Sequence, residues 1–229
     1  MSIKLNSFIE HTLLKPESQM NSFKQLCLEA KENLFLGVCV NSSWVEYCRK
    51  EIDILFQADP KQKSKVVAVV GFPLGVCLTS AKAFETEKCI LLGADEIDMV
   101  INIGLLKDQQ YHKVENDIRA VVDAASGKPV KVIFETHLLS QEEKIAACRA
   151  SVAAGAQFVK TSTGFSGGGA TVEDVQLMRQ AVGEKMGVKA SGGVRSREQA
   201  LKMIDAGASR LGTSSGVAIV QGYTQESDY

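Results

Sequence analysis

Short apolar runs alternate with longer amphipathic segments along the whole chain. The apolar runs have the length of buried strands, and each segment between them is long enough for one crossover helix. We predict eight strands, at approximately residues 8–12, 36–40, 66–71, 96–101, 131–135, 157–161, 187–190 and 209–212. Several of the intervening segments open with the spacing of a helical capping box, at Ser22/Gln25, Ser140/Glu143, Thr171/Asp174 and Ser196/Gln199. The pattern therefore predicts an α/β protein.

A short motif recurs where predicted helices end and predicted strands begin. Its copies are Leu92-Gly93-Ala94-Asp95, Ala154-Gly155-Ala156-Gln157 and Ala206-Gly207-Ala208-Ser209, and their glycines are 62 and 52 residues apart. Each interval spans about two βα units. Eight even units in a chain of 229 residues favour a compact (β/α)8 TIM barrel with few insertions. A doubly wound open sheet is the alternative, although it rarely needs eight such even units.

Composition and charge are those of one globular domain. Hydrophobic residues make up 45% of the chain and charged residues 23%, and no linker divides it, so we expect a single domain over residues 1–229. The polar stretch 221–229 is predicted to be a mobile C-terminal tail. A formal net charge of −1 gives no electrostatic case for binding nucleic acid or an anionic membrane. No apolar run reaches the roughly 20 residues of a membrane helix, and no signal peptide is evident, so we expect a cytoplasmic protein.

The cysteines and histidines predict neither disulfides nor a metal site. The six cysteines include no Cys-x-x-Cys pair and lie in apolar surroundings, which is typical of reduced core thiols. The histidines, His11, His112 and His137, are far apart and lack the His-x-x-x-His spacing. A metal site assembled from distant positions stays open, but nothing in the sequence predicts one, and we expect no cofactor.

Two lysines occupy equivalent positions at the ends of predicted strands. Lys160 follows Phe158-Val159, Lys189 follows Gly187-Val188, and small residues and glycines come after both. Most lysines pack their stem and leave the ammonium group in water, which is the ordinary interpretation of either residue alone. If the two strands are neighbours, two ammonium groups meet in one pocket, where like charge and desolvation both favour a neutral amine. A neutral lysine can attack a carbonyl compound to form a Schiff base.

Asp98 places a carboxylate inside the apolar run Ile97-Asp98-Met99-Val100-Ile101. Burying a carboxylate without a partner is costly. We therefore expect Asp98 either to form a structural ion pair or to face Lys160 and Lys189 and handle protons. The sequence leaves both interpretations open.

Two loops rich in glycine and serine predict an anion site. Gly212-Thr213-Ser214-Ser215-Gly216 matches the nucleophile elbow of hydrolases, but no histidine follows His137, so the required triad order is missing. The serine hydroxyls and backbone N–H groups of this loop favour anion binding instead, helped by Gly192-Gly193 and Arg195. Barrels often hold phosphate after strands seven and eight. A reactive lysine beside a phosphate site is the equipment of a metal-free aldolase acting on a small phosphorylated sugar.

Several stretches, taken together, resemble the deoxyribose-phosphate aldolase family from one end of the chain to the other. They are residues 9–16, 38–41, 70–75, 94–102, 158–165, 188–195 and 212–220. The resemblance implies reversible cleavage of 2-deoxy-D-ribose 5-phosphate to D-glyceraldehyde 3-phosphate and acetaldehyde. It also implies a homodimer or homotetramer.

The resemblance further implies a role for particular residues. It places the Schiff-base lysine at Lys160, a second lysine that perturbs it at Lys189, and a proton-handling aspartate at Asp98. Substrate contacts are implied at Thr12, Gly164, Gly192, Gly193, Arg195, Ser214 and Ser215, and a proton-transfer role at the C-terminal Tyr229. Glu10 stands where the family usually has aspartate. His137 occupies a variable position, where we expect a neutral loop histidine.

Two other functions remain open from the sequence. Another Schiff-base aldolase, or a transaldolase, would use a different donor in the same kind of site. A catalytically silent phosphate-binding barrel would bind sugar phosphates without capturing an aldehyde. A metal-dependent aldolase is disfavoured, because the sequence contains no histidine cluster.

Overall fold

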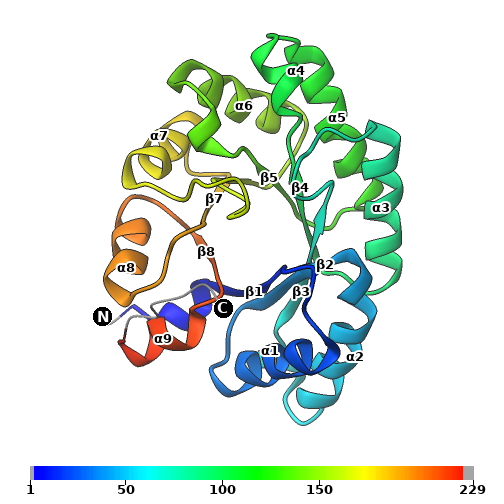
Figure 1. The fold of residues 1–229 in the computed structure, drawn as a ribbon, viewed down its shortest axis with the longest axis vertical. Helices are drawn as coiled ribbons and strands as arrows, with labels where there is room; N and C mark the ends of the chain where they lie inside the picture. Colours follow the sequence, from blue (N-terminus) through cyan, green and yellow to red (C-terminus); the bar gives the residue numbers. More distant parts are fainter. Residues whose placement is uncertain (1–2, 224–229) are drawn as a thin grey trace.

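The computed structural model describes residues 3–223, and a closed parallel barrel lies at its centre (Figure 1). The strands are β1 (Ile9–Leu13), β2 (Gly37–Asn41), β3 (Lys65–Val70), β4 (Glu96–Val100), β5 (Val130–Ile133), β6 (Phe158–Lys160), β7 (Gly187–Ser191) and β8 (Arg210–Thr213). They pair in sequence order, and β8 closes the barrel against β1. The eight predicted strands and the predicted (β/α)8 TIM barrel are therefore confirmed.

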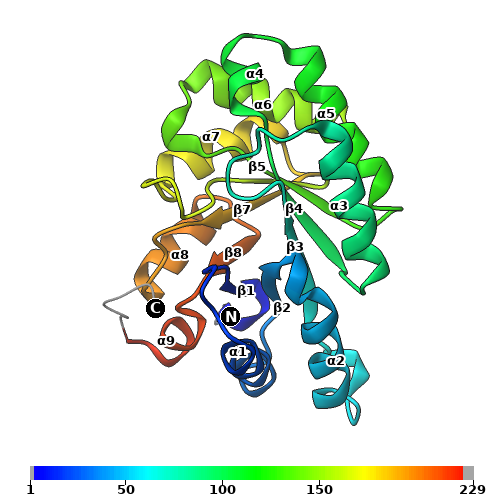
Figure 2. The same cartoon turned by 45° about the vertical axis from the view of Figure 1, so that its right-hand side comes forward.

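The helices form an outer ring around the strands, as Figures 1 and 2 show. The α-helices are α1 (Met20–Glu32), α2 (Val45–Leu55), α3 (Thr79–Leu91), α4 (Ile103–Lys107), α5 (Tyr111–Ala124), α6 (Gln141–Ala153), α7 (Val172–Val182), α8 (Arg197–Asp205) and α9 (Gly216–Gln221). The 3-10 helices are η1 (Leu5–Phe8), η2 (Ser42–Trp44), η3 (Pro60–Gln62) and η4 (Thr136–Leu138). Because each crossover returns the chain to a parallel strand, the carboxyl ends of all the strands share one rim of the barrel.

The helix caps follow the sequence at three of the four predicted places. The side chains of Ser140 and Ser196 each begin a complete capping box, and Thr171 accepts the backbone N–H of the third helical residue. The prediction at Ser22 is wrong, because α1 already begins at Met20. Ser22 instead lies inside the first turn and donates its backbone N–H to the carbonyl of Gln19.

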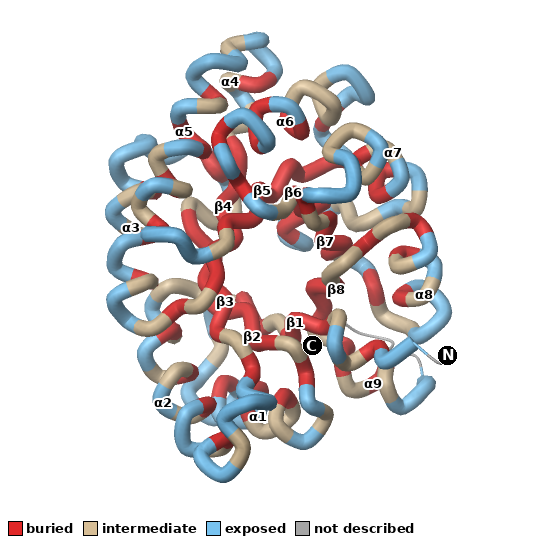
Figure 3. Tube along the Cα trace, turned by 180° about the vertical axis from the view of Figure 1, so that it is seen from behind, coloured by how far each residue is buried: buried red, intermediate tan, exposed pale blue. Residues whose placement is uncertain are grey.

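Alternation along the strands separates an apolar outer face of the barrel from a more polar interior. Ile97 and Met99 of β4 and Val132 of β5 face outward and join the main core between the strands and the helices. Successive strand residues point to opposite sides, so the residues between them face inward. Figure 3 shows the resulting buried ring of strands inside the exposed outer surface of the helices. Charged residues at inward positions must therefore find partners inside the barrel.

The other predictions about the chain have mixed outcomes. The cysteines are unpaired, as expected, and all are buried except Cys77, which is exposed rather than a core thiol. No helix within residues 3–223 has both the length and the apolar character needed to cross a membrane. The predicted tail, residues 221–229, overlaps α9 at Gln221. Residues 224–229, and with them Tyr229, lie outside the described residues.

Candidate active site

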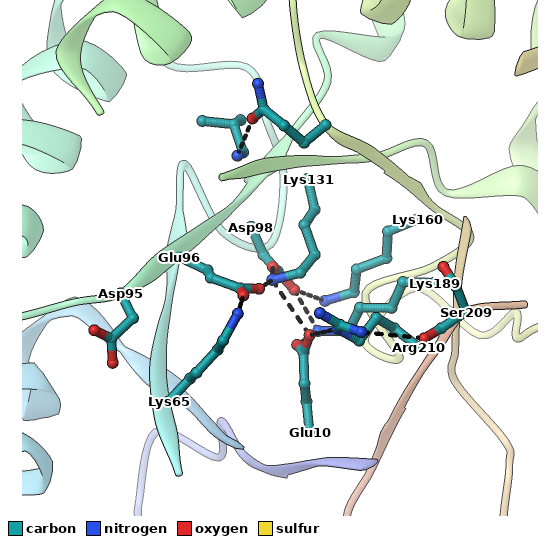
Figure 4. A network of polar contacts seen from close by, with 12 residues as sticks. Glu10, Lys65, Asp95, Glu96, Asp98, Lys131, Lys160, Lys189, Ser209 and Arg210 are labelled. Atoms are coloured by element: carbon teal, nitrogen blue, oxygen red, sulfur yellow. Dashed lines mark hydrogen bonds and ion pairs between the residues drawn. The ribbon is translucent and has the colours of Figure 1, made fainter. Parts of the chain in front are cut away.

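Lys160 and Lys189 lie side by side inside the barrel. The two lysines are register partners on the neighbouring strands β6 and β7, and both side chains are almost completely buried. Their Nζ atoms meet at one oxygen of Asp98, which comes from β4 (Figure 4). The distances to Asp98 Oδ2 are 2.8 Å from Lys160 and 2.6 Å from Lys189. The structure thus brings together the three residues that the sequence singled out from separate strands.

Asp98 is a carboxylate held by cations rather than a neutral acid. Burial alone raises its pKa, but the nearby charges of Lys131, Lys160 and Lys189 lower the pKa well below its usual range. The charged form is therefore favoured at neutral pH, in which Asp98 can accept a proton or stabilise a cation. Both interpretations left open by the sequence fit this geometry, because Asp98 forms ion pairs and also faces the two lysines.

A third buried lysine, Lys131 of β5, belongs to the same cluster and was not predicted as a site residue from the sequence. Its Nζ lies 2.7 Å from Glu96, 2.9 Å from Asp98 and 3.3 Å from Glu10, and all of these side chains are buried. A usable signal was present, because Lys131 interrupts the apolar run 130–134 as Asp98 interrupts 97–101. Period-2 alternation also places Glu96 on the same inward face as Asp98.

The carboxylates of the cluster keep Lys131 and Lys189 protonated. Burial alone lowers the pKa of each lysine, but Asp98 and Glu10 outweigh burial and raise both pKa values above the ordinary value for lysine. Lys189 makes a very short contact with Glu10 in addition to its contact with Asp98. Lys189 is therefore the lysine of the pair that stays charged, because two carboxylates accompany it.

A cavity of about 470 Å³ opens at the carboxyl ends of β6, β7 and β8. Its lining residues are Thr12, Leu14, Lys15, Thr163, Gly164, Phe165, Gly167, Gly168, Gly169, Ser191, Gly192, Gly193, Val194, Arg195, Gly212, Thr213 and Ser214. Six of the seven substrate contacts expected from the resemblance are among them. Lys189 adjoins the cavity through Gly212, where an added Cβ would come within 2.8 Å of Lys189 Cε.

Ser215 is the expected substrate contact that does not line the cavity. Its side chain is buried, and its Oγ has no hydrogen-bond partner within residues 3–223. Its backbone N–H donates to Thr213 Oγ1 at 2.9 Å. The loop before α9 therefore offers fewer free donors than the sequence suggested, because one of them is used within the loop.

The loops around the cavity approach each other at Gly169 and Gly192. An added Cβ at Gly169 would lie 2.6 Å from the carbonyl oxygen of Gly192, and that same oxygen accepts the backbone N–H of Ala170 at 2.9 Å. Gly192 itself has a φ of 92°, which favours glycine. Small residues are therefore needed here because the backbones of two loops pack directly together.

No metal site is formed by the residues that the structure describes, since no group of three or more His, Cys, Asp or Glu side chains there is arranged to hold an ion. The described site consists instead of amines, carboxylates and backbone groups. A closed (β/α)8 barrel with a cavity at the carboxyl ends of its strands has the architecture of a barrel enzyme.

Comparison with known proteins defines the enzyme more closely. A sequence model of the DeoC/LacD family of aldolases matches residues 12–222. The deoxyribose-phosphate aldolase of Bdellovibrio bacteriovorus is 56% identical over 228 residues, covering 99% of this chain and all of the relative. That of Halalkalibacterium halodurans is 56% identical over 230 residues, covering both chains fully. The chain therefore belongs to the DeoC/LacD family of aldolases, and it is a carbon–carbon lyase of the aldehyde-lyase class.

Solved structures agree with this assignment. A putative deoxyribose-phosphate aldolase from Coccidioides immitis matches with a TM-score of 0.89 and 41% identity, covering 95% of this chain and 85% of that one. A deoxyribose phosphate aldolase from Aeropyrum pernix, described as a unique tetramer, matches with a TM-score of 0.87 and 31% identity, covering 95% and 89%. The family resemblance seen in the sequence is thus confirmed.

Proposed function

We propose that this protein reversibly cleaves 2-deoxy-D-ribose 5-phosphate to D-glyceraldehyde 3-phosphate and acetaldehyde, through a Schiff base on Lys160. The observation that carries the proposal is the meeting of Lys160 and Lys189 at one oxygen of Asp98, next to a cavity that suits a phosphorylated triose. Relatives that are more than half identical over their whole length are deoxyribose-phosphate aldolases.

The contacts of the three buried lysines support Lys160 as the nucleophile. Lys131 contacts three carboxylates and Lys189 contacts two, whereas Lys160 contacts Asp98 alone within residues 3–223. The fewer carboxylates hold an ammonium group, the less is lost when it gives up its proton. Positive side chains also outnumber negative ones in the cluster, because Lys65 contacts Glu96 and Arg210 lies 3.6 Å from Glu10. Loss of one proton from Lys160 reduces that excess.

In the synthetic direction, the neutral amine of Lys160 attacks the carbonyl carbon of acetaldehyde to give a carbinolamine. The ammonium group of Lys189 donates a proton to the departing hydroxyl, and water leaves to form an iminium ion. Asp98 stabilises this new cation, because its carboxylate already lies 2.8 Å from the nitrogen. Lys189, left neutral by that donation, takes a proton from the methyl carbon to give an enamine. The enamine attacks the aldehyde of glyceraldehyde 3-phosphate, and the aldehyde oxygen takes the proton back from Lys189. Hydrolysis of the resulting iminium by water releases the product and restores the amine of Lys160.

The cavity supplies the binding site for the phosphate in this proposal. Gly192, Gly193 and Ser214 offer backbone and hydroxyl donors, and Arg195 adds charge. Gly164 follows the nucleophile on the loop after β6, and Thr12 of β1 also lines the cavity, where it can contact a substrate hydroxyl. We keep Ser215 as a weaker candidate, because it becomes a ligand only if its buried hydroxyl turns toward the cavity.

Our proposal for the assembly follows from the same assignment. We infer a single aldolase domain over residues 1–229 that acts as a homodimer or homotetramer, with the Aeropyrum pernix tetramer as support. Its partners are the sugar phosphate and acetaldehyde. The free thiols support a reducing, cytoplasmic location.

Reductive trapping tests the proposal directly. Acetaldehyde with borohydride should add one ethyl group to the protein, and peptide mapping should find it on Lys160. An unchanged protein mass would favour a catalytically silent phosphate-binding barrel. Modification of another lysine would show that this other lysine is the nucleophile. Competition between acetaldehyde and a ketone donor separates this activity from that of a transaldolase.

A further inference from the structure

Glu135 is a buried carboxylate whose partners lie on the loop that lines the cavity. It follows β5 in the left-handed conformation, with φ 58° and ψ 62°. Its Oε2 accepts the backbone N–H of Thr163 at 3.3 Å and also a very short hydrogen bond from the Thr163 hydroxyl. Its Oε1 has no hydrogen-bond partner within the described residues. A buried carboxylate oxygen without a donor is costly, so a nearby donor is expected to matter.

His137 is the side chain placed to interact with Oε1 of Glu135. Its Nδ1 lies 3.5 Å from Glu135 Oε1, which is close enough for electrostatic attraction but long for a hydrogen bond. The same ring packs against Gly168, where an added Cβ would lie only 2.2 Å from Cγ of His137. His137 therefore touches both the carboxylate that holds Thr163 and the backbone farther along the same loop.

The loop from residue 163 to 169 is thereby fixed along its length. At its start, Thr163 is held by Glu135 and accepts the backbone N–H of Phe165 at 3.0 Å. At its end, Gly169 packs on Gly192. His137 supports the middle, at Gly168, which is part of the cavity wall. The loop begins three residues after Lys160, so its shape sets where a bound phosphate lies relative to the nucleophile.

We propose that Glu135 and His137 are a positioning pair that holds loop 163–169 in the shape that binds the phosphate group of the substrate. Among residues 3–223, neither side chain forms a hydrogen bond or ion pair with Lys160, and the pair acts by selecting phosphorylated over unphosphorylated substrates. This inference rests on the proposed aldolase function, and it adds residues that select the substrate without taking part in the chemistry.

Comparison of a phosphorylated and an unphosphorylated substrate tests the pair. His137→Ala removes the ring that packs against Gly168 and lies nearest Glu135 Oε1, so it should raise the KM for 2-deoxyribose 5-phosphate about tenfold with little change in kcat. Its kcat/KM for 2-deoxyribose should stay within about twofold of wild type, because 2-deoxyribose lacks the phosphate group that the loop is proposed to bind. His137→Gln keeps a donor for Oε1 and should restore KM to within about threefold.

Gly168→Ala provides an independent variant and a coupling measurement. In the wild-type background the new Cβ must displace the His137 ring, so KM for the phosphorylated substrate should rise. In a His137→Gly background the ring is gone, and so is the Cβ of residue 137, which would otherwise lie 2.6 Å from the new Cβ; the same change should then have little effect. Contacting residues show such non-additivity, whereas independent sites do not.

The two proposals fail in different ways. If acetaldehyde and borohydride leave the wild-type protein unmodified, the aldolase function itself is wrong. If trapping succeeds but His137→Ala leaves KM for the phosphorylated substrate unchanged, the positioning pair is wrong. It is also wrong if both substrates lose activity equally, or if Gly168→Ala has the same effect in both backgrounds.

Discussion

Replacing Lys131 with methionine tests whether the buried charge cluster stabilises the barrel. The Nζ of Lys131 contacts three buried carboxylates at 2.7 to 3.3 Å, and methionine keeps much of the side-chain length without the charge. Removing one partner of a buried ion pair leaves an uncompensated charge, which typically costs about 3–5 kcal/mol. Each of the three carboxylates keeps another cationic partner in the variant, so we expect the free energy of unfolding to fall by the lower end of that range, about 3 kcal/mol.

The pH dependence of this loss follows from the directions of the pKa shifts. The pKa of Asp98 is lowered in the folded protein, so its contribution is present above the unfolded pKa of about 4 and is lost as pH falls through the folded value. The pKa of Lys131 is raised, so its contribution is present below the unfolded pKa of about 10.4 and is lost as pH rises through the folded value. The difference between wild type and variant should therefore be constant from about pH 5 to 10 and shrink outside that window.

Urea unfolding followed by the fluorescence of Trp44, the only tryptophan, measures this difference. Lys128→Met, which changes an exposed lysine just before the same strand, is the matched control and should leave the free energy of unfolding unchanged. A loss of less than about 1 kcal/mol at pH 7 would refute the reasoning, because the ammonium group would then not be compensating buried charge. So would a loss that grows as the pH falls below 4.

The remaining predictions concern catalysis. Lys160→Ala should abolish both turnover and reductive trapping while leaving the protein folded; more than a trace of activity would place the nucleophile elsewhere. Lys189→Met removes the ammonium group that shares Asp98, so kcat should fall by about 10²- to 10⁴-fold, the usual effect of losing an acid–base group. Steady-state kinetics that show only a KM effect would contradict this role. Arg195→Gln should raise KM for the phosphorylated substrate and leave that for 2-deoxyribose unchanged; equal effects on both would exclude a phosphate contact.

The fold and the central site residues could be predicted because both depend on local pattern. The spacing of apolar residues predicts buried strands and amphipathic helices, and eight evenly sized βα repeats are compatible with few folds. Once parallel strands close in order, residues at their carboxyl ends must share one rim. Lys160, Lys189 and Asp98 could therefore be placed together from the amino-acid sequence, as could six of the residues that line the cavity.

The charges that surround those residues were decided by the tertiary structure. Lys189 pairs with Glu10, which lies 179 residues earlier, and Lys131 joins carboxylates from two other strands. Such pairings depend on which inward-facing residues of neighbouring strands lie at the same height in the barrel. The register between strands decides this, and the spacing of apolar residues does not predict the register. The sign of an electrostatic effect depends on every neighbour at once. Two neighbouring cations by themselves would favour the loss of a proton, yet the packed barrel supplies Lys189 with two carboxylates and raises its pKa.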